Sequence, residues 1–326
     1  MTKRYLLIDE PGMPYGIFLN VLLAISPVIA WAIYLYGFRP ITLILLCVAS
    51  VFILDTVFSK LRTHKVRTDL SCAVTGVIAA LLLPASSPLW LPVFVGALAG
   101  TIRNVFGGLG KNPINPAATS LLISRLLFSK TFSVIPKIFE RLNGISFTVN
   151  APERASENPL SVIIGGRVPD TSLDEAFFGF RAGMMGEMSA FLLIVAGIYL
   201  VCRRIAKPVL PAIFLLTIGV ITYIKPTLVA ASDTVAISGS IHNMIGSSTI
   251  LCAVFMLTDP VTSPKTIDGS VFAGFAGGIA TVLVRYCISV EASALVGVLC
   301  ANGISVITNK YLRPVPFGGE VKKQSK

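Results

Sequence analysis

A short segment rich in glycine and asparagine is the part of this sequence best suited to binding a ligand. It runs from Phe106 to Ala117 and contains Gly110, Lys111 and Asn112. Glycines let a backbone approach a ligand closely, and the segment leads into a predicted helix whose N-terminus would favour anions. The segment does not fit the P-loop pattern, because the residues around Gly110 and Lys111 have the wrong spacing. A ligand site and a plain turn are therefore the two interpretations.

Two carboxylates are candidates for an ion path or a cofactor site. Glu187 and Asp259 each lie at a short motif that has a counterpart in the other half of the chain. An unpaired charge at the centre of a bilayer costs ~3 kcal/mol or more, so such a group should face a partner, a cavity or the membrane surface. The other ionisable residues in or beside apolar runs are Asp55, Arg103, Arg125, Arg285 and Glu291. For Arg285 and Glu291, which lie near the ends of runs, solvation at the membrane surface is the favoured interpretation.

Metal and haem centres held by this chain alone are not predicted. The two histidines, His64 and His242, are expected on opposite sides of the membrane, which argues against a bis-histidine haem or a histidine-rich metal site. The cysteines show no C-x-x-C spacing, so we expect them to act as small apolar side chains. A cluster shared with another chain stays open. The cysteines are Cys47, Cys72, Cys202, Cys252, Cys287 and Cys300.

The composition indicates what must position these residues. The chain has 326 residues, of which 54% are hydrophobic and 13% are charged, which is more apolar surface than a soluble domain of this size can bury. It therefore predicts an all-α integral membrane protein, because about 20 apolar residues make one membrane span. Ten apolar runs are found at 17–36, 41–58, 70–84, 88–105, 116–132, 188–202, 207–224, 241–258, 269–287 and 290–308.

The distribution of the basic residues indicates how the chain is oriented in the membrane. The net charge of +11 comes from cations in short connections rather than from a stripe interleaved with aromatic residues, so nucleic acid is not an expected partner. Connections 59–69, 103–115 and 203–208, with the tail 310–326, carry most of these cations. The positive-inside rule then places both termini in the cytoplasm.

One membrane domain with two halves is the predicted organisation. It comprises a first five-helix half at 1–132, an outer loop at 133–186, a second five-helix half at 187–309 and a cytoplasmic tail at 310–326. Faint symmetry supports this, because both halves reach a proline-rich break, at 112–116 and at 259–264. Since each half has five runs, the second half must be inverted relative to the first.

Several motifs resemble one known family in order along nearly the whole chain. They are Gly107–Asn112 followed by Asn115–Ala117, then Gly186–Ala190, Phe255–Pro264 and Arg313–Gly318. They resemble the RnfD/NqrB family, which includes the D subunit of the Rnf ferredoxin:NAD oxidoreductase and the B subunit of the sodium-pumping NADH:quinone oxidoreductase. The resemblance implies about ten helices in two inverted five-helix repeats, a bacterial plasma membrane, partner subunits, and electron transfer coupled to sodium or proton movement.

The resemblance also implies flavin, with one departure in this chain. In the family, FMN is joined through its phosphate to a threonine in a Ser-Gly-Ala-Thr-Pro-Leu-like element of the outer loop. Asn158 stands at that position here, and an amide cannot form the phosphoester. Ser156 has a hydroxyl but lies two positions away, and the charge of Glu157 opposes an incoming phosphate. We therefore expect no covalent FMN at this element, and either a non-covalent flavin or none.

A second, non-covalent flavin such as riboflavin is also implied between the helices, with Gly110, Lys111 and Asn112 as candidates to hold it. The first functional hypothesis is a non-autonomous subunit of an ion-translocating oxidoreductase that relays electrons through flavin. The chain lacks a nicotinamide-binding glycine fingerprint, so oxidation of NADH or ferredoxin is expected in partner subunits. The alternatives are a flavin-free transporter or channel on the same scaffold, and a structural subunit that holds its neighbours in register.

Overall fold

A computed structural model describes residues 13–63, 70–108, 110–139, 142, 158–167, 171–224 and 233–312. Within these ranges the chain consists of helices and loops and has no strand. Ser156, Glu157, His64 and the tail beyond residue 312 lie outside the described residues. The structure therefore does not test the predictions made for these residues.

Up to residue 132 the helices follow the predicted runs closely. The helices up to residue 132 are α1 (Met13–Tyr36), α2 (Arg39–Thr63), α3 (Ser71–Leu81), α4 (Trp90–Val105), α5 (Pro116–Leu127) and α6 (Ser129–Phe132). The segment 133–186 contains two short helices, α7 (Pro159–Ile164) and α8 (Leu173–Phe178). The run at 116–132 was predicted as one helix, but it divides into α5 and α6 at Phe128.

The second half contains a broken helix. Its elements are α9 (Ala190–Cys202), α10 (Val209–Ile224), α11 (Asp233–Ile245), α12 (Thr249–Leu251), a π-helix (Cys252–Met256), α13 (Ile267–Cys287) and α14 (Val290–Tyr311). The run at 241–258 was predicted as one helix, but Ser247 and Ser248 both adopt positive φ, at 47° and 62°. The helix direction changes by 56° across this break. Left-handed backbone at two serines therefore ends α11 inside an apolar run.

The chain is a multi-pass membrane protein. Within its described residues, four helices are long and apolar enough to span a bilayer, and the bent pair formed by α11 with α12 and the π-helix would make a fifth span if counted as one. The four lie at Gly16–Tyr36, Arg39–Leu61, Ile267–Cys287 and Val290–Tyr311. The other predicted runs also coincide with helices, but these are shorter. The coarse prediction of an all-helical membrane protein is confirmed for the described residues.

Glycines let two pairs of helices pack at close range. A Cβ at Gly96 of α4 would lie 2.0 Å from Ser50 Oγ and 2.5 Å from the Cys47 carbonyl oxygen of α2. A Cβ at Gly278 of α13 would lie 2.6 Å from Thr217 Cβ in α10. Because lipid supplies no hydrophobic drive between helices, close backbone approach at small residues is a main source of helix association in membranes.

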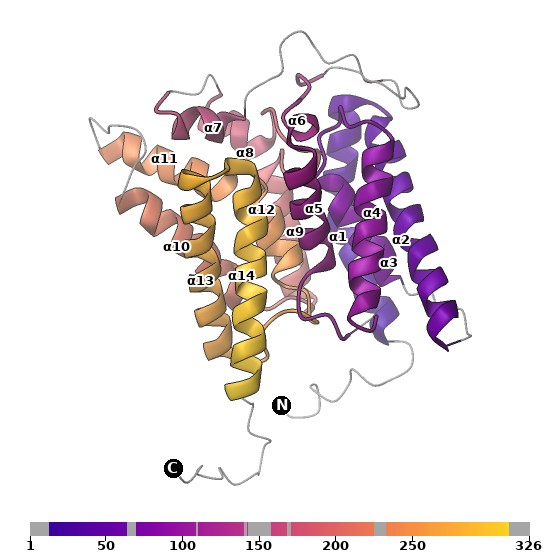
Figure 1. Ribbon diagram of the computed structural model, residues 1–326. Helices are drawn as coiled ribbons and strands as arrows, with labels where there is room; N and C mark the ends of the chain where they lie inside the picture. The colour runs from indigo at the N-terminus through magenta and orange to yellow at the C-terminus, as the bar shows by residue number, and fades with distance from the viewer. Residues whose placement is uncertain are drawn as a thin grey trace, which may run out of the picture.

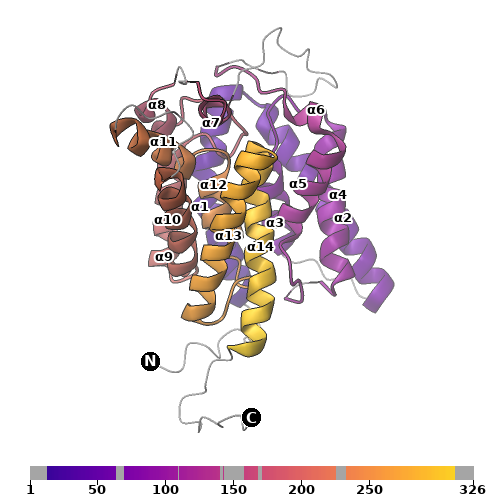
Figure 2. The ribbon, with the colours of Figure 1, turned by 60° about the vertical axis from the view of Figure 1, so that its left-hand side comes forward.

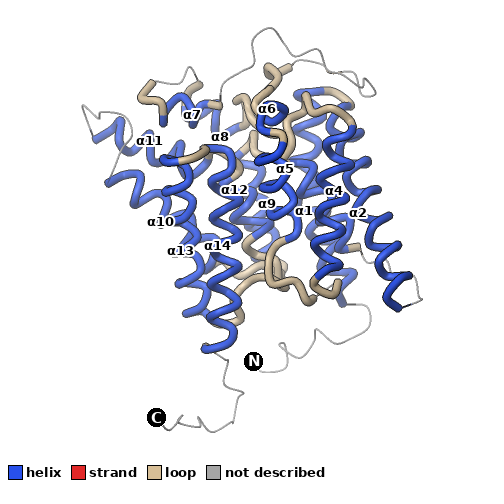
Figure 3. Tube along the Cα trace, in the orientation of Figure 1, coloured by secondary structure: helices blue, strands red, loops and turns tan. Residues whose placement is uncertain are grey.

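The two ends of the molecule differ in structure. Helices α6, α7 and α8 lie together at one end (Figure 1). The loops that precede α5 and α13 lie at the opposite end, near the C-terminal end of α14 (Figure 3). Helices α13 and α14 run side by side between these ends (Figure 2). The glycine- and asparagine-rich segment and Asp259 are thus brought to one end of the molecule.

Candidate functional site

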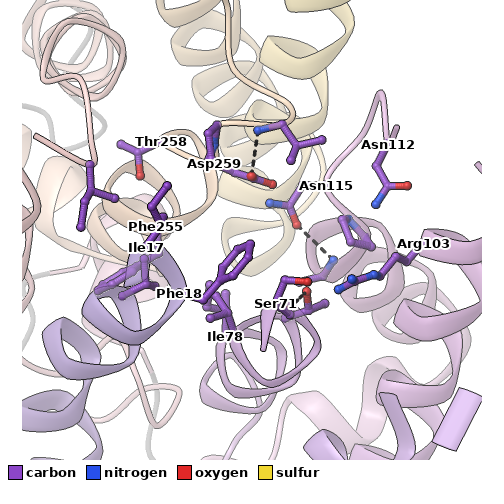
Figure 4. Close-up of a pocket in the computed structure, with 18 of the residues that line it drawn as sticks. Ile17, Phe18, Ser71, Ile78, Arg103, Asn112, Asn115, Phe255, Thr258 and Asp259 are labelled. Atoms are coloured by element: carbon purple, nitrogen blue, oxygen red, sulfur yellow. Dashed lines mark hydrogen bonds between the residues drawn. The ribbon is translucent and has the colours of Figure 1, made fainter. Parts of the chain in front are cut away.

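A partly open cavity is lined by residues of both halves of the chain and by the loops that precede α5 and α13. Figure 4 shows Ile17, Phe18 and Phe255 on one side of it and Arg103, Asn112 and Asn115 on the other. The remaining apolar lining residues include Val21, Val74, Ile78, Leu200 and Ile205, and the remaining polar ones include Ser71, Thr75, Thr258 and Asp259. The cavity therefore has an apolar wall and a polar wall, as small-molecule sites commonly do.

Asn115 organises the polar wall. Its side-chain oxygen accepts hydrogen bonds from the backbone N–H groups of Ala117 and Ala118, at 3.0 and 3.1 Å, and so caps the N-terminus of α5. Its Nδ2 donates to the carbonyl oxygen of Met256 in the π-helix at 3.5 Å. The helix N-terminus was predicted to favour an anion, but the cap occupies these two N–H groups. Asn115 therefore caps α5, and the backbone N–H groups of Ala117 and Ala118 are unavailable to a phosphate.

The three predicted flavin-site residues differ in position. Gly110 adopts a φ of +81° and lines the cavity, which explains the requirement for glycine there. Asn112 also lines the cavity and is buried, and its Oδ1 has no hydrogen-bond donor among the described residues. Lys111 is exposed and is not a lining residue. A buried acceptor that lacks a donor lowers the stability of the folded chain, so Asn112 is suited to bind a ligand that carries an N–H or O–H group.

Arg103 is the one basic side chain among the residues that line the cavity. Its Nε lies 3.4 Å from Asp55 Oδ1, and Asn104 donates a hydrogen bond to the same oxygen at 3.0 Å. The Arg103 charge also acts on Asp259 across the cavity wall. The guanidinium is therefore already balanced by carboxylates of this chain, and the described lining residues include no second cation for a phosphate.

Asp259 lies in the loop after the π-helix, outside the membrane-spanning helices, and is half-buried. Its Oδ1 accepts a hydrogen bond from Val261 N at 3.0 Å. Burial raises the pKa of the Asp259 carboxyl above its ordinary value, and the Val261 N–H and the Arg103 charge offset this only in part. The group is thus held where protonation is favoured more than in water.

This shift predicts a pH-dependent effect of Asp259→Asn. Because the pKa is higher in the folded state, the folded chain binds the proton more tightly, and this contribution to stability falls as the pH rises through the raised value. We expect the variant to have a higher Tm than the wild type near neutral pH, with the gain disappearing below about pH 4. Thermal unfolding across a pH series tests this, with exposed Asp268→Asn as the control. A gain that is equal at every pH would contradict the prediction.

Glu187 belongs to a different site, in the network around the break between α11 and α12. Its side chain is 2% exposed and accepts a short hydrogen bond from Ser248 Oγ. Arg181 donates to the carbonyl oxygens of Glu187, Met188 and Ile245, the last at 2.8 Å. Glu187 does not line the cavity that contains Asp259. The structure therefore separates the two carboxylates that the sequence suggested as an ion path.

Arg285 was predicted to be solvated at the membrane surface, and this prediction is wrong. It is 2% exposed and donates to the Asn243 carbonyl oxygen at 2.7 Å, to Asn243 Oδ1 at 3.1 Å and to Thr249 Oγ1 at 2.8 Å. Its Nε donates to Ser293 Oγ at 3.2 Å. The helix break is the physical reason, because it leaves buried carbonyl groups without intrahelical donors.

Glu291 is only partly buried, with a side chain that is 23% exposed, and it forms an ion pair. Its Oε2 lies 3.1 Å from Arg125 Nη1, and Arg125 Nη2 donates to the Leu82 carbonyl oxygen at 3.4 Å. Glu291 was predicted to be solvated at the membrane surface; it keeps partial exposure there and also forms an ion pair that joins α5 to α14. Arginine side chains therefore donate hydrogen bonds to carbonyl oxygens at the C-terminal ends of α3 and α11, where the helices supply no further donors.

Asn158, at the position of the family's FMN-bearing threonine, is buried at 4% exposure. Its Oδ1 accepts a hydrogen bond from Leu160 N at 3.1 Å and so caps α7. It offers no hydroxyl, and its side chain is enclosed. The residue present here therefore does not fit a covalent flavin phosphoester.

Asn302 of α14 is a site residue that sequence analysis missed. Its Oδ1 accepts the backbone N–H of Asn115 at 2.8 Å, which links α14 to the polar wall of the cavity. The available signal was an asparagine in the middle of an apolar run, where a polar side chain needs a partner. The sequence does not indicate which partner it finds.

Comparisons with known proteins agree with one another. The model of the NQR2, RnfD, RnfE family matches residues 15–318. The D subunit of the ion-translocating oxidoreductase complex of Halorhodospira halophila is 32% identical over 327 residues, covering 92% of this chain and 90% of that protein. The D subunit of the Na(+)-translocating ferredoxin:NAD(+) oxidoreductase complex of Acetobacterium woodii is 28% identical over 94% of this chain and 92% of its own length. The proton-translocating counterpart of Clostridium ljungdahlii is 25% identical over 92% of this chain and 90% of its own.

Proposed function

Because this chain belongs to the NQR2, RnfD, RnfE family, we propose that it is the D subunit of an Rnf-type ion-translocating electron transport complex. Three relatives that match nearly end to end are named as the D subunits of such complexes, and this agreement carries the proposal. Since relatives of similar identity are named for sodium and for protons, the ion moved by this chain is sodium or a proton. The chain works with other membrane and peripheral subunits, which oxidise the soluble electron donor. It is a non-autonomous part of the oxidoreductase.

The proposal includes ten transmembrane helices in two inverted five-helix repeats. The short helices fall at the remaining apolar runs, and the pairs α2–α4 and α10–α13 both pack at a glycine, Gly96 and Gly278. The spacing of proline, serine and threonine also repeats, because Pro-x-Ser-Ser-Pro at 84–88 corresponds to Pro-x-Thr-Ser-Pro at 260–264. This pairing is closer than the match between 112–116 and 259–264.

We propose that the chain lies in a bacterial plasma membrane with both termini in the cytoplasm and the 133–186 connection outside. The end that holds the cavity also carries exposed Arg203, Lys207 and Lys265, as the positive-inside rule requires of a cytoplasmic face. The opposite end carries an aromatic cluster in which Trp31 and Phe180 lie 5.4 Å apart, typical of a membrane–water interface.

The cavity is the proposed site of a non-covalent flavin. Ile17, Phe18 and Phe255 offer an apolar surface to a flat ring, and Asn112 Oδ1 offers an acceptor to a ring N–H. Because Arg103 is balanced by carboxylates and the α5 N-terminus is capped, a flavin without phosphate, such as riboflavin, suits the cavity better than FMN. The isoalloxazine, when bound, supplies the electron transfer, while these residues hold and orient it.

An outer covalent FMN is not proposed at Asn158, whose buried amide caps α7. Ser156 stays a prediction as an alternative hydroxyl. For the ion path, Asp259 is the better supported candidate, because it is half-buried in the wall of a cavity at the cytoplasmic end. The role of Glu187 in that path also stays a prediction, since its carboxylate is bonded to Ser248 within an arginine-rich network.

Flavin content and affinity test the proposal. We expect the purified complex to release riboflavin from this chain on denaturation, and the denatured chain to lack flavin fluorescence at this site. Asn112→Leu should weaken riboflavin rebinding by about tenfold, because it removes one hydrogen-bond acceptor from a buried site. Lys111→Ala, at the exposed neighbour, is the matched control and should bind as the wild type does.

The outcomes separate the alternatives. Tighter binding of FMN than of riboflavin would contradict the inference that the cavity selects a flavin without phosphate. Fluorescence that remains on the denatured chain would point to a hydroxyl such as Ser156 as a covalent site. A chain that contains no flavin in either state would favour a flavin-free transporter, channel or scaffold.

A further inference from the structure

Asn302 supports the cavity although it is not a lining residue. It lies in the middle of α14, is 1% exposed, and accepts the backbone N–H of Asn115 with its Oδ1 at 2.8 Å. The N-cap residue of a helix lacks an intrahelical acceptor for its own N–H, so this donor must be satisfied from elsewhere. Asn302 satisfies it across the interface between α5 and α14.

The bond completes the hydrogen bonding of Asn115. Both ends of the Asn115 amide are engaged, because Oδ1 accepts from Ala117 N and Ala118 N while Nδ2 donates to the Met256 carbonyl oxygen. Together with the bond from its backbone N–H to Asn302, these contacts fix the orientation of Asn115 and link α5, α14 and the π-helix. Within a membrane protein, loss of one such bond leaves a buried polar group with no water to replace it.

Both walls of the cavity are connected to the hydrogen bonds of Asn115. On the polar side, Asn115 follows Asn112 by three residues, so the position of its backbone fixes the end of the loop that presents Asn112. On the apolar side, Phe255 precedes Met256, whose carbonyl oxygen accepts from Asn115. The π-helix is a geometry often found at functional sites, and its last residue is the one bonded here.

We propose that Asn302 is a positioning residue for the cavity, which acts through Asn115 to hold the Asn112 loop and the Phe255 wall at the separation that a flavin ring requires. This inference rests on the proposed flavin function. Asn302 itself touches no flavin, so its effect must appear through the environment and affinity of the bound ring.

Two variants in the purified complex test the inference. Asn302→Leu removes the acceptor. Asn302→Ser withdraws the acceptor but supplies a hydroxyl that can bond within its own helix, as Ser305 does with Ala301, so this variant is expected to fold. Ser305→Ala is the matched control, because it removes a buried hydroxyl of α14 whose hydrogen bond stays within that helix.

The readouts are the riboflavin dissociation constant, the visible spectrum and midpoint potential of the bound flavin, and the Tm. We expect the leucine and serine variants to weaken binding by about tenfold and to change the flavin spectrum and potential, while Ser305→Ala keeps them near wild type. Leucine and serine variants that lower the Tm but leave affinity, spectrum and potential unchanged would overturn the positioning role alone. A wild-type chain without flavin would overturn the proposed function, and the positioning role with it.

Discussion

Replacing Arg285 by leucine is expected to destabilise the second half of the chain by about 3 kcal/mol or more. The guanidinium donates to the Asn243 carbonyl and side-chain oxygens, to Thr249 Oγ1 and to Ser293 Oγ. Its removal leaves several buried acceptors without donors, and each unsatisfied group costs about 1–3 kcal/mol. The break between α11 and α12 should then lose its defined geometry. Thermal unfolding and monodispersity in detergent measure the effect.

A charge-conserving variant separates charge from geometry at this position. Arg285→Lys keeps the cation but cannot reach acceptors on two sides of the break, because its single ammonium replaces a planar fork. We expect it to recover only part of the lost stability. Lys310→Leu, at the exposed end of α14, is the control for loss of a positive charge. An Arg285→Leu protein as stable as the Lys310→Leu protein would show that the network contributes little.

Replacing Gly96 by valine is expected to separate α4 from α2 and to prevent correct folding of the first half. The added Cβ alone would lie 2.0 Å from Ser50 Oγ and 2.5 Å from the Cys47 carbonyl oxygen, far inside van der Waals contact. Overpacking of this kind costs about 1–3 kcal/mol where neighbours can move, and more where one neighbour is backbone. Expression level and Tm in detergent are the measurements.

Two further variants make the test of Gly96 specific. Gly303→Val in α14 is the matched control, because nothing lies within 4 Å of a Cβ built there. Ser50→Ala in the Gly96→Val background should restore little, since the Cys47 carbonyl oxygen remains in the way. Full rescue by Ser50→Ala would mean that the side chain, rather than the backbone of α2, sets the helix separation.

The sequence predicted the long apolar helices well, because their signal is composition alone. The runs at 17–36 and 290–308 fall inside α1 and α14. It failed at the break after α11, where Gly246, Ser247 and Ser248 form the kind of glycine–serine segment at which helices kink, because the apolar residues on both sides were read as one continuous run. Left-handed backbone there is stabilised by Arg181 and Arg285, which lie far from it in sequence.

The cavity was predictable on one side only. Gly110 and Asn112 were identified from a local concentration of turn residues, and both line the cavity. Phe18 and Phe255 could not be identified, because an apolar residue that faces a cavity looks the same in sequence as one that faces lipid. Asn302 was missed for a related reason, since its partner Asn115 is 187 positions away.

The short turn between α13 and α14 has a consequence for the order of assembly. Only Ile288 and Ser289 separate these two tightly packed helices, so they form a hairpin, and Arg285 and Glu291 flank its turn. On the proposed topology, insertion of this hairpin carries both charges to the outer side of the membrane. Apart from Ser293, which lies within the hairpin itself, their described partners precede them in sequence and are synthesised earlier: Asn243 and Thr249 for Arg285, and Arg125 for Glu291. The last hairpin to be inserted therefore meets a partly built bundle that already presents acceptors for its cation and a cation for its carboxylate.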